Sequence, residues 1–293
     1  MSTTTPSPYR GLLNRLHKKT PVTEPAKHAK RAFQKKRFSL SATVLGFTIL
    51  FLFLPLIYII VFSFNESKGS EFTNFSLVWY KKLFCDSDNL WEALLNSLII
   101  AFLASAVATI LGTLAAIGIN WYKFKGRMYI QTISFLPMVL PEVIVGVSTL
   151  IFFSGINMPL GLFTIFAAHT TFCLPFVFLM VSARIEEFDF SIIEAAHDLG
   201  ATDRQTMLKV IIPAILPGIL SGFMMSVTMS LEDFVITFFV SGPGSTTLPL
   251  YVYSMIRFGV SPVINALSFV VILATVLITF LLRKFLKVIA ASN

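Results

Sequence analysis

Six long apolar stretches dominate the chain, and polar connections separate them. About 20 consecutive apolar residues are needed to cross the hydrocarbon core of a bilayer, and each stretch approaches or exceeds that length. The pattern therefore predicts an all-α integral membrane protein with about six transmembrane helices. The stretches cover about 40–63, 94–119, 129–153, 159–182, 213–229 and 263–282.

The region after the fifth stretch permits two interpretations. The acidic pair Glu232–Asp233 follows that stretch, and a second apolar run, Phe234–Val240, comes directly after the pair. A helix that continues through 230–250 and a helix followed by a re-entrant segment both fit this pattern.

The distribution of charge predicts an orientation. Residues 1–37 hold ten of the 23 Lys and Arg residues and one acid, Glu24. Because cytoplasmic segments are enriched in Lys and Arg, we expect 1–38 to be a basic cytoplasmic tail and 39–64 the first transmembrane helix. The C-terminus is then cytoplasmic as well, and 65–93 form an external loop. The external side receives four basic residues in this arrangement, namely Lys68, Lys81, Lys82 and Arg257.

The net charge of +8 raises the question of a nucleic-acid partner. The excess belongs to one tail beside the first apolar stretch, where basic residues attract anionic lipid, and no motif of a nucleic-acid-binding fold accompanies it. Charged residues make up 13% of the chain, against about 25% in soluble domains. We therefore expect membrane lipid, and no nucleic acid, as a partner.

The cytoplasmic connection 184–212 begins with the signals of a short helix. Ser191 and Glu194 have the spacing of a capping box, in which each side chain bonds to the backbone amide of the other residue. Gly200 then suits the left-handed position that ends a helix. We expect a helix between these signals, followed by a glycine turn.

A second helix should follow the glycine turn. Thr202 and Gln205 form another capping box, and the helix that they open leads to Pro213 at the membrane boundary. The connection is therefore more structured than a plain link between two spans.

Small and apolar residues in this connection favour a docking surface. Ala195 and Ala196 would let another backbone approach closely, and apolar residues in a loop that faces water suggest a partner. The alternative is that the first helix packs on its own bundle. The apolar residues are Ile192, Ile193 and Leu199.

The order Glu194-Ala195-Ala196, three residues, Gly200, nine residues and then Val210-x-Ile212-Pro213 resembles the EAA loop of the membrane subunits of ABC importers. The family has Ile and Leu where this chain has Val210 and Ile212, and both changes are conservative. In that family the loop is a coupling helix that enters a cleft of the ATP-hydrolysing subunit. The resemblance therefore implies ATPase-coupling roles for Ser191, Glu194, Ala195, Ala196, Gly200, Thr202 and Pro213.

The resemblance extends over 90–287, which is similar to the type-1 ABC permease domain and in particular to spermidine/putrescine permeases. It implies a type-1 transmembrane domain over 94–287 with the coupling loop at 184–212. The acidic pair, usually Asp-Asp in the family, is Glu232-Asp233 here, and the long basic tail is not expected. The similar stretches are Phe172–Phe176, Glu194–Thr202, Ser241–Gly244, Leu248–Leu250 and Ile256–Pro262.

The same resemblance implies a function and partners. The chain is expected to be a multi-pass protein of the bacterial inner membrane that forms the path for polyamines. Its expected partners are an ATPase dimer, a second and related permease subunit, and an external solute-binding protein. ATP and magnesium would bind to the ATPase, and no cofactor to this chain.

Three acids lie inside or beside the outer parts of the apolar stretches: Glu142, Glu232 and Asp233. An unpaired charge at the bilayer centre costs roughly 3 kcal/mol on insertion scales, and these stretches hold no Lys or Arg that could pair with them. Such residues usually face a water-filled path. A straight helix of 1.5 Å per residue places Glu142 about 20 Å from its cytoplasmic end. The alternatives are a hydrogen-bond acceptor at a proline break for Glu142, and a solvated outer edge for the acidic pair.

A path lined with carboxylates favours cations, and aromatic rings could hold them through cation–π contacts. Tyr251 and Tyr253 are candidates for this role, together with Phe238 and Phe239. The alternative for each ring is plain packing.

The sequence argues against an enzyme. It has no G-x-x-x-x-G-K-[ST] motif for ATP, no pairing of a nucleophile with a base, and no metal-ligand spacing around Cys85 or Cys173. A secondary transporter or channel would use the acids for ion coupling but has no use for the coupling loop. Because importers of iron and phosphonate share that loop, those solutes stay open as alternative cargo.

Overall fold

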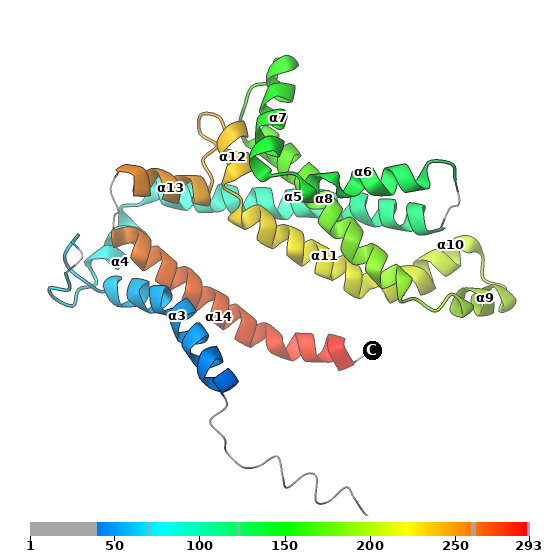
Figure 1. Ribbon diagram of the computed structural model, residues 1–293, viewed down its shortest axis with the longest axis horizontal. Coiled ribbons are helices and arrows are strands. Elements are labelled where there is room, and N and C mark those ends of the chain that lie inside the picture. Colours follow the sequence, from blue (N-terminus) through cyan, green and yellow to red (C-terminus); the bar gives the residue numbers. More distant parts are fainter. Residues whose placement is uncertain (1–39, 70, 122–123, 259–261, 292–293) are drawn as a thin grey trace, which may run out of the picture. The chain divides into compact units, whose positions relative to one another are not determined.

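The computed structural model describes residues 40–69, 71–121, 124–258 and 262–291. The regular secondary structure of the described residues is helical, apart from one isolated antiparallel bridge between Asn65 and Phe75 (Figure 1). The all-α prediction is confirmed, whereas the basic tail 1–38 lies outside the described residues. The helices are α3 (Leu40–Phe62), α4 (Val78–Cys85), α5 (Asp88–Trp121), α6 (Arg127–Val139), α7 (Glu142–Gly155), α8 (Leu162–Glu186), α9 (Ser191–Asp198), α10 (Asp203–Thr206), η1 (Met207–Ile211), α11 (Ile212–Glu232), α12 (Val235–Val240), α13 (Leu248–Phe258) and α14 (Pro262–Ala291).

Five stretches of helix in the described chain are long and apolar enough to cross a membrane, and a sixth exists if the bent pair α6–α7 counts as one span. This agrees with the six predicted stretches. The side on which each terminus lies stays a prediction. The chain divides after Ile57 into two units, and the unit from Tyr58 onward contains the helical core.

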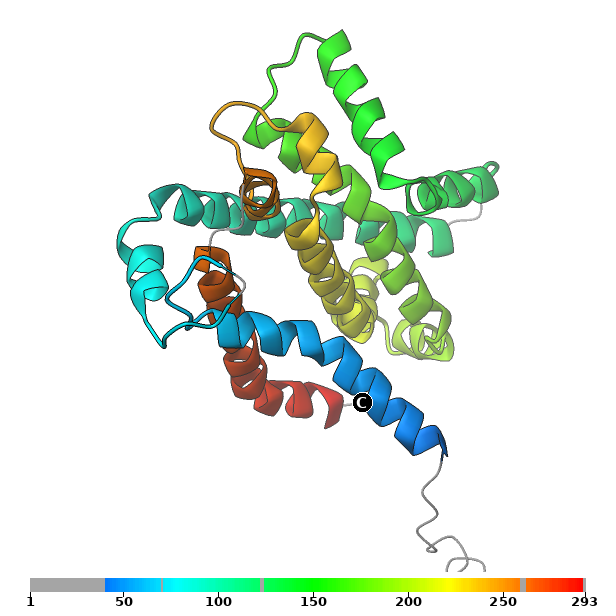
Figure 2. The same cartoon turned by 60° about the vertical axis from the view of Figure 1, so that its left-hand side comes forward.

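Helices α5, α8 and α11 form the core of this unit and lie side by side (Figures 1 and 2). Two glycines allow the close approach, because a Cβ atom built on Gly112 would lie 2.9 Å from Val177 Cβ, and one on Gly222 would lie 3.1 Å from Val177 Cα. Membrane helices that pack without a strong hydrophobic drive rely on such small residues. Val177 of α8 is therefore clamped between α5 and α11.

The third predicted span is broken. Helices α6 and α7 meet at an angle of 107°, and Leu140 between them is extended with ψ of 138°. Pro141 explains the break, since its ring disfavours a helical conformation in the preceding residue. Glu142 therefore begins a new helix, and the straight-helix estimate of its depth is wrong.

The region 230–250 is not one continuous helix. α11 ends at Glu232, Asp233 is extended with ψ of 123°, and the six-residue helix α12 follows. The chain then turns through Gly244, whose φ is 73°, before α13 begins. The interpretation as a single helix is thereby excluded.

The predicted external loop 65–93 contains α4, and α5 begins within it at Asp88. Trp79 of α4 is buried and donates from Nε1 to the backbone oxygen of Asn65 at 2.7 Å. Trp79 and Leu83 pack against the first turns of α14. The segment is therefore folded onto the helical unit.

Candidate functional site

The helix α9 starts differently from the prediction. Ser191 is its first residue, and its side chain makes no cap. Asp189 takes that role, because Oδ1 accepts from the amide of Ser191 at 2.9 Å, and this bond lowers the pKa of Asp189. The predicted capping box of Ser191 and Glu194 is wrong, since Phe190 is already helical, with φ of −65° and ψ of −17°.

The glycine turn and the second capping box are confirmed. Gly200 has φ of 82°, and the amide of Ala201 donates to the carbonyl of Ala196 at 3.0 Å, as in the Schellman ending of a helix. The amide of Thr202 donates to Gln205 Oε1 at 2.9 Å, and the amide of Gln205 donates back to Thr202 Oγ1 at 3.4 Å. Local hydrogen bonding thus fixes the angle between α9 and α10.

The apolar residues of α9 and its turn divide between two faces. Leu199 is 89% exposed and Ile192 is 47% exposed. Ile193 is partly buried and packs against the helical core, so its predicted exposure is wrong. One face of this helix therefore packs on the bundle, as the alternative interpretation expected, whereas the other face is open. Docking of a partner on the open face stays a prediction. Ala195 is exposed, and Ala196 is partly buried.

A π-helix, η1, connects α10 to α11. The amide of Ile212 donates to the carbonyl of Met207, so helical bonding continues from η1 into α11. Pro213, which has no amide to donate, follows as the second residue of α11. Single π-helical turns inside longer helices are frequent at functional sites. α9 and α10 thus connect through η1 directly to the base of α11.

The other end of α11 opens on a cavity of about 310 Å³. Figures 1 and 2 place α12 at the end of α11 that lies opposite α9 and α10. The 21 residues of α11 correspond to about 30 Å at 1.5 Å per residue. The cavity is lined by Glu142, Phe172, Met229, Glu232, Asp233, Phe234 and Val235.

Two of the predicted acids, Glu142 and Glu232, line this cavity with exposed side chains. Glu142 comes from the first turn of α7 and Glu232 from the last residue of α11, so the break at Pro141 brings together residues that are 90 positions apart in the sequence. No Lys or Arg is among the described residues that line the cavity. Its polar surface is therefore acidic, beside the apolar side chains of Phe172 and Met229.

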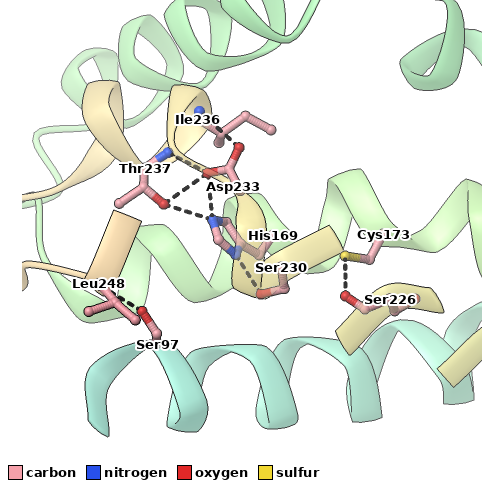
Figure 3. Close-up of polar contacts among 9 residues, drawn as sticks. All are labelled: Ser97, His169, Cys173, Ser226, Ser230, Asp233, Ile236, Thr237 and Leu248. Atoms are coloured by element: carbon pink, nitrogen blue, oxygen red, sulfur yellow. Dashed lines mark hydrogen bonds and ion pairs between the residues drawn. The ribbon is translucent and has the colours of Figure 1, made fainter. Parts of the chain in front are cut away.

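Asp233 lies in the cavity wall, but its side chain is only 2% exposed. Its oxygens accept from the amides of Ile236 at 3.2 Å and Thr237 at 2.9 Å, and from the Thr237 hydroxyl at 2.9 Å (Figure 3). His169 Nε2 of α8 lies 3.1 Å from Oδ2. Asp233 therefore caps α12 and is already surrounded by donors.

The local sequence pattern predicts no role for His169. His169 and Asp233 are 64 positions apart, and no local pattern connects them. The available signal was the position of His169, since it is the one histidine inside a predicted apolar stretch.

The two candidate tyrosines lie in different places. Tyr253 packs on Phe234 with ring centroids 4.4 Å apart, and so it supports the wall of the acidic cavity. Tyr251 instead lines a separate cavity of about 270 Å³ with Asn89, Glu92 and Asn96. The acids and the two tyrosines therefore do not form one site. Among the described residues, no group of three or more His, Cys, Asp or Glu side chains could hold a metal ion.

A helical bundle with a paired-helix loop at one end and an acidic cavity at the other is an arrangement suited to a transport permease. Residues 108–292 match the family described as "Binding-protein-dependent transport system inner membrane component". The chain belongs to this family, and it is accordingly a multi-pass membrane protein.

Individual relatives have more specific descriptions than the family. The spermidine/putrescine transport system permease protein PotC of Haemophilus influenzae is 37% identical over 84% of this chain and 95% of its own length. The putrescine transport system permease protein PotI of Escherichia coli is 40% identical over 81% and 86%. A putative 2-aminoethylphosphonate transport system permease protein, PhnV of Salmonella typhimurium, is 29% identical over 82% and 91%.

Solved structures confirm the fold. A bacterial ABC transporter involved in the import of the acidic polysaccharide alginate has a chain that matches with a TM-score of 0.67 at 17% identity, over 90% of this chain and 99% of that chain. The MetNI methionine ABC transporter, in an inward-facing conformation, matches with a TM-score of 0.55 at 20% identity, over 68% and 93%. The expected type-1 ABC permease fold is thus confirmed.

Proposed function

We propose that this chain is the membrane-spanning permease subunit of an ATP-driven importer of polyamines, of the spermidine and putrescine type. The similarity to PotC and PotI over most of the chain supports the class of cargo. The observation that carries the proposal is the cavity that exposes Glu142 and Glu232 beside apolar side chains, with no described basic residue in its lining.

The chemistry of this cavity suits a polyamine. Such a molecule carries positive amines that are separated by apolar methylene groups. Glu142 and Glu232 can accept charge-assisted hydrogen bonds from the amines, while Phe172, Met229 and Phe234 contact the methylene groups. The ring of Phe234 can also attract an ammonium group.

The same cavity disfavours an anionic cargo. A phosphonate would bring its negative charge close to Glu142 and Glu232, and like charges repel. The lower identity to the 2-aminoethylphosphonate permease points the same way. An ion-coupled secondary transporter remains the less favoured alternative, because it would leave the exposed face of α9 without a role.

Energy would enter at the opposite end of the molecule. The exposed side chains of Ile192 and Leu199 form an apolar surface on α9 and its glycine turn, which would seat in a partner ATPase dimer that binds ATP and magnesium. Motion there would pass through η1 into α11, whose last residue is Glu232. A second, related permease subunit and an external solute-binding protein would complete the transporter in the bacterial inner membrane.

Substitution of the two cavity acids, Glu142 and Glu232, tests the proposed function. The complex of this chain with its partner permease, ATPase and binding protein is reconstituted in proteoliposomes, and ATP-dependent uptake of labelled spermidine is measured. Glu142→Gln and Glu232→Gln should each lower the uptake about tenfold, because a hydrogen bond to a charged group becomes a weaker neutral one. Glu71→Gln, an exposed acid in the connection before α4 and outside both the cavity and the coupling loop, is the control and should leave uptake unchanged. Wild-type uptake by both cavity variants would remove the cavity from the path.

A further inference from the structure

A buried polar cluster connects three helices beside the acidic cavity. His169 of α8 is 1% exposed. Its Nδ1 lies 2.7 Å from Ser230 Oγ in the last turns of α11, and its Nε2 lies 3.1 Å from Asp233 Oδ2 and 3.0 Å from Thr237 Oγ1 of α12 (Figure 3). One side chain thus contacts the end of α11, the break and the start of α12.

The hydrogen atoms of this cluster can be assigned. The hydroxyl of Thr237 donates to Asp233 Oδ2, so it can only accept from His169. Nε2 therefore carries a hydrogen, which is shared between Thr237 Oγ1 and Asp233 Oδ2. The amides of Ile236 and Thr237 also donate to Asp233. Four donors therefore surround the carboxylate of Asp233: two backbone amides, the Thr237 hydroxyl and the imidazole of His169 in α8. The hydroxyl of Ser230 lies within hydrogen-bonding distance of Nδ1 on the other side of the ring.

The cluster determines which acid faces the cavity. Asp233 and Glu232 are neighbours at a break in the helix, where the backbone changes from helical to extended. Asp233 is drawn into the protein by its four donors, whereas Glu232 is exposed and lines the cavity. Without these hydrogen bonds to Asp233, the backbone at the break could rotate and move Glu232 out of the cavity lining.

The cluster also influences the position of the other acid. α12 packs against α7, where a Cβ built on Gly146 would lie 2.7 Å from the ring of Phe239 and 3.4 Å from Ile236 Cα. Glu142 lies one turn before Gly146 at the start of the same helix. Fixing the start of α12 therefore fixes the spacing between Glu142 and Glu232.

We propose that His169 is a positioning residue of the transport path, which holds Asp233 at the break between α11 and α12 so that Glu232 and Glu142 face a common cargo. This inference rests on the proposed function of the cavity. A buried pair of this kind is weak evidence for stability, because apolar residues of similar volume often stabilise a core as well or better. Its directional bonds, in contrast, select one geometry of the break.

The test measures ATP-dependent uptake of labelled spermidine by the full reconstituted complex, with saturating binding protein. His169→Ala should lower uptake about tenfold, as expected for the loss of a hydrogen bond to a charged group. His169→Gln, whose amide can still donate to Asp233, should recover uptake to within about threefold of the wild type. The matched control is Cys173→Ala, since Cys173 is buried one turn further along α8 and contacts the Ser226 carbonyl at 3.6 Å instead of Asp233. It should keep wild-type uptake.

A double-mutant cycle separates positioning from general stability. If His169 acts through Glu232, then His169→Ala should add less than about twofold to the effect of Glu232→Gln. The proposal would be overturned if the fold-losses of His169→Ala and Glu232→Gln multiply in the double variant, or if His169→Gln does not recover uptake. If the His169→Ala complex does not assemble, Thr237→Val takes its place in the same cycle and is read by the same criterion. Wild-type uptake by Glu232→Gln would instead refute the proposed cavity itself, so the two failures are distinguishable.

Discussion

The glycine turn between α9 and α10 gives a graded prediction for energy coupling. Gly200 has φ of 82°, a region that costs a residue with a Cβ roughly 1–2 kcal/mol. A Cβ built on Gly200 meets no atom within 4 Å, so the cost comes from backbone strain and not from a clash within the chain. Replacing Gly200 should therefore change the angle of the docking helix while leaving the bundle intact.

The series Gly200→Asn, Gly200→Ala and Gly200→Val should separate these costs. Asn tolerates the left-handed region best, Ala carries a cost of roughly 1 kcal/mol, and Val, as a β-branched residue, carries the largest. Because about 1.4 kcal/mol corresponds to a factor of ten, spermidine-stimulated ATP hydrolysis should fall about tenfold or more for Val and by smaller factors for Ala and Asn.

The control for this series is Gly118→Ala. Gly118 is helical in α5, has no positive φ, and also has no atom within 4 Å of a built Cβ. This variant should keep full activity, since alanine is favoured over glycine in a helix. Equal activity of all Gly200 variants, or an equal loss in Gly118→Ala, would refute the reasoning from backbone strain.

Two further predictions concern docking and packing. Leu199→Asp should reduce retention of the ATPase about tenfold during purification. Leu199 is 89% exposed in the free chain, and its replacement would lose roughly 1.5–3 kcal/mol of apolar burial against the ATPase. Leu77→Asp, outside the coupling loop, should retain the ATPase, and equal retention by both variants would contradict the docking face. Gly222→Val should lower the thermal midpoint of the detergent-solubilised protein, because its Cβ would press on Val177 at 3.1 Å and overpacking costs roughly 1–3 kcal/mol. Gly155→Ala, where a Cβ meets no atom within 4 Å, is the matched control, and an unchanged midpoint for Gly222→Val would contradict the close packing.

Features encoded by local chemistry could be predicted from the sequence. Long apolar stretches identified the spans, because a bilayer demands about 20 apolar residues of a crossing helix. The turn at Gly200 and the box of Thr202 and Gln205 were predicted correctly, since the bonds involved join residues only a few positions apart. The box at Ser191 failed because Asp189, two residues earlier, competes for the same amide.

Features that depend on distant residues could not be predicted. The spacing of Glu142 and Glu232 depends on the 107° bend at Pro141, and a sequence pattern gives the break but not its angle. The burial of Asp233 depends on His169, 64 positions away. The sequence therefore identified the acids of the candidate site but could not divide them into exposed and buried members.

The most direct test of the central claim is ATP-dependent uptake into proteoliposomes that contain the complete transporter, measured side by side for labelled spermidine, putrescine and 2-aminoethylphosphonate. The acidic lining of the cavity predicts uptake of at least one polyamine, little uptake of the phosphonate, and loss of polyamine uptake in the double variant Glu142→Gln/Glu232→Gln. Uptake of the phosphonate in preference to both polyamines, or full polyamine uptake by the double variant, would contradict the account.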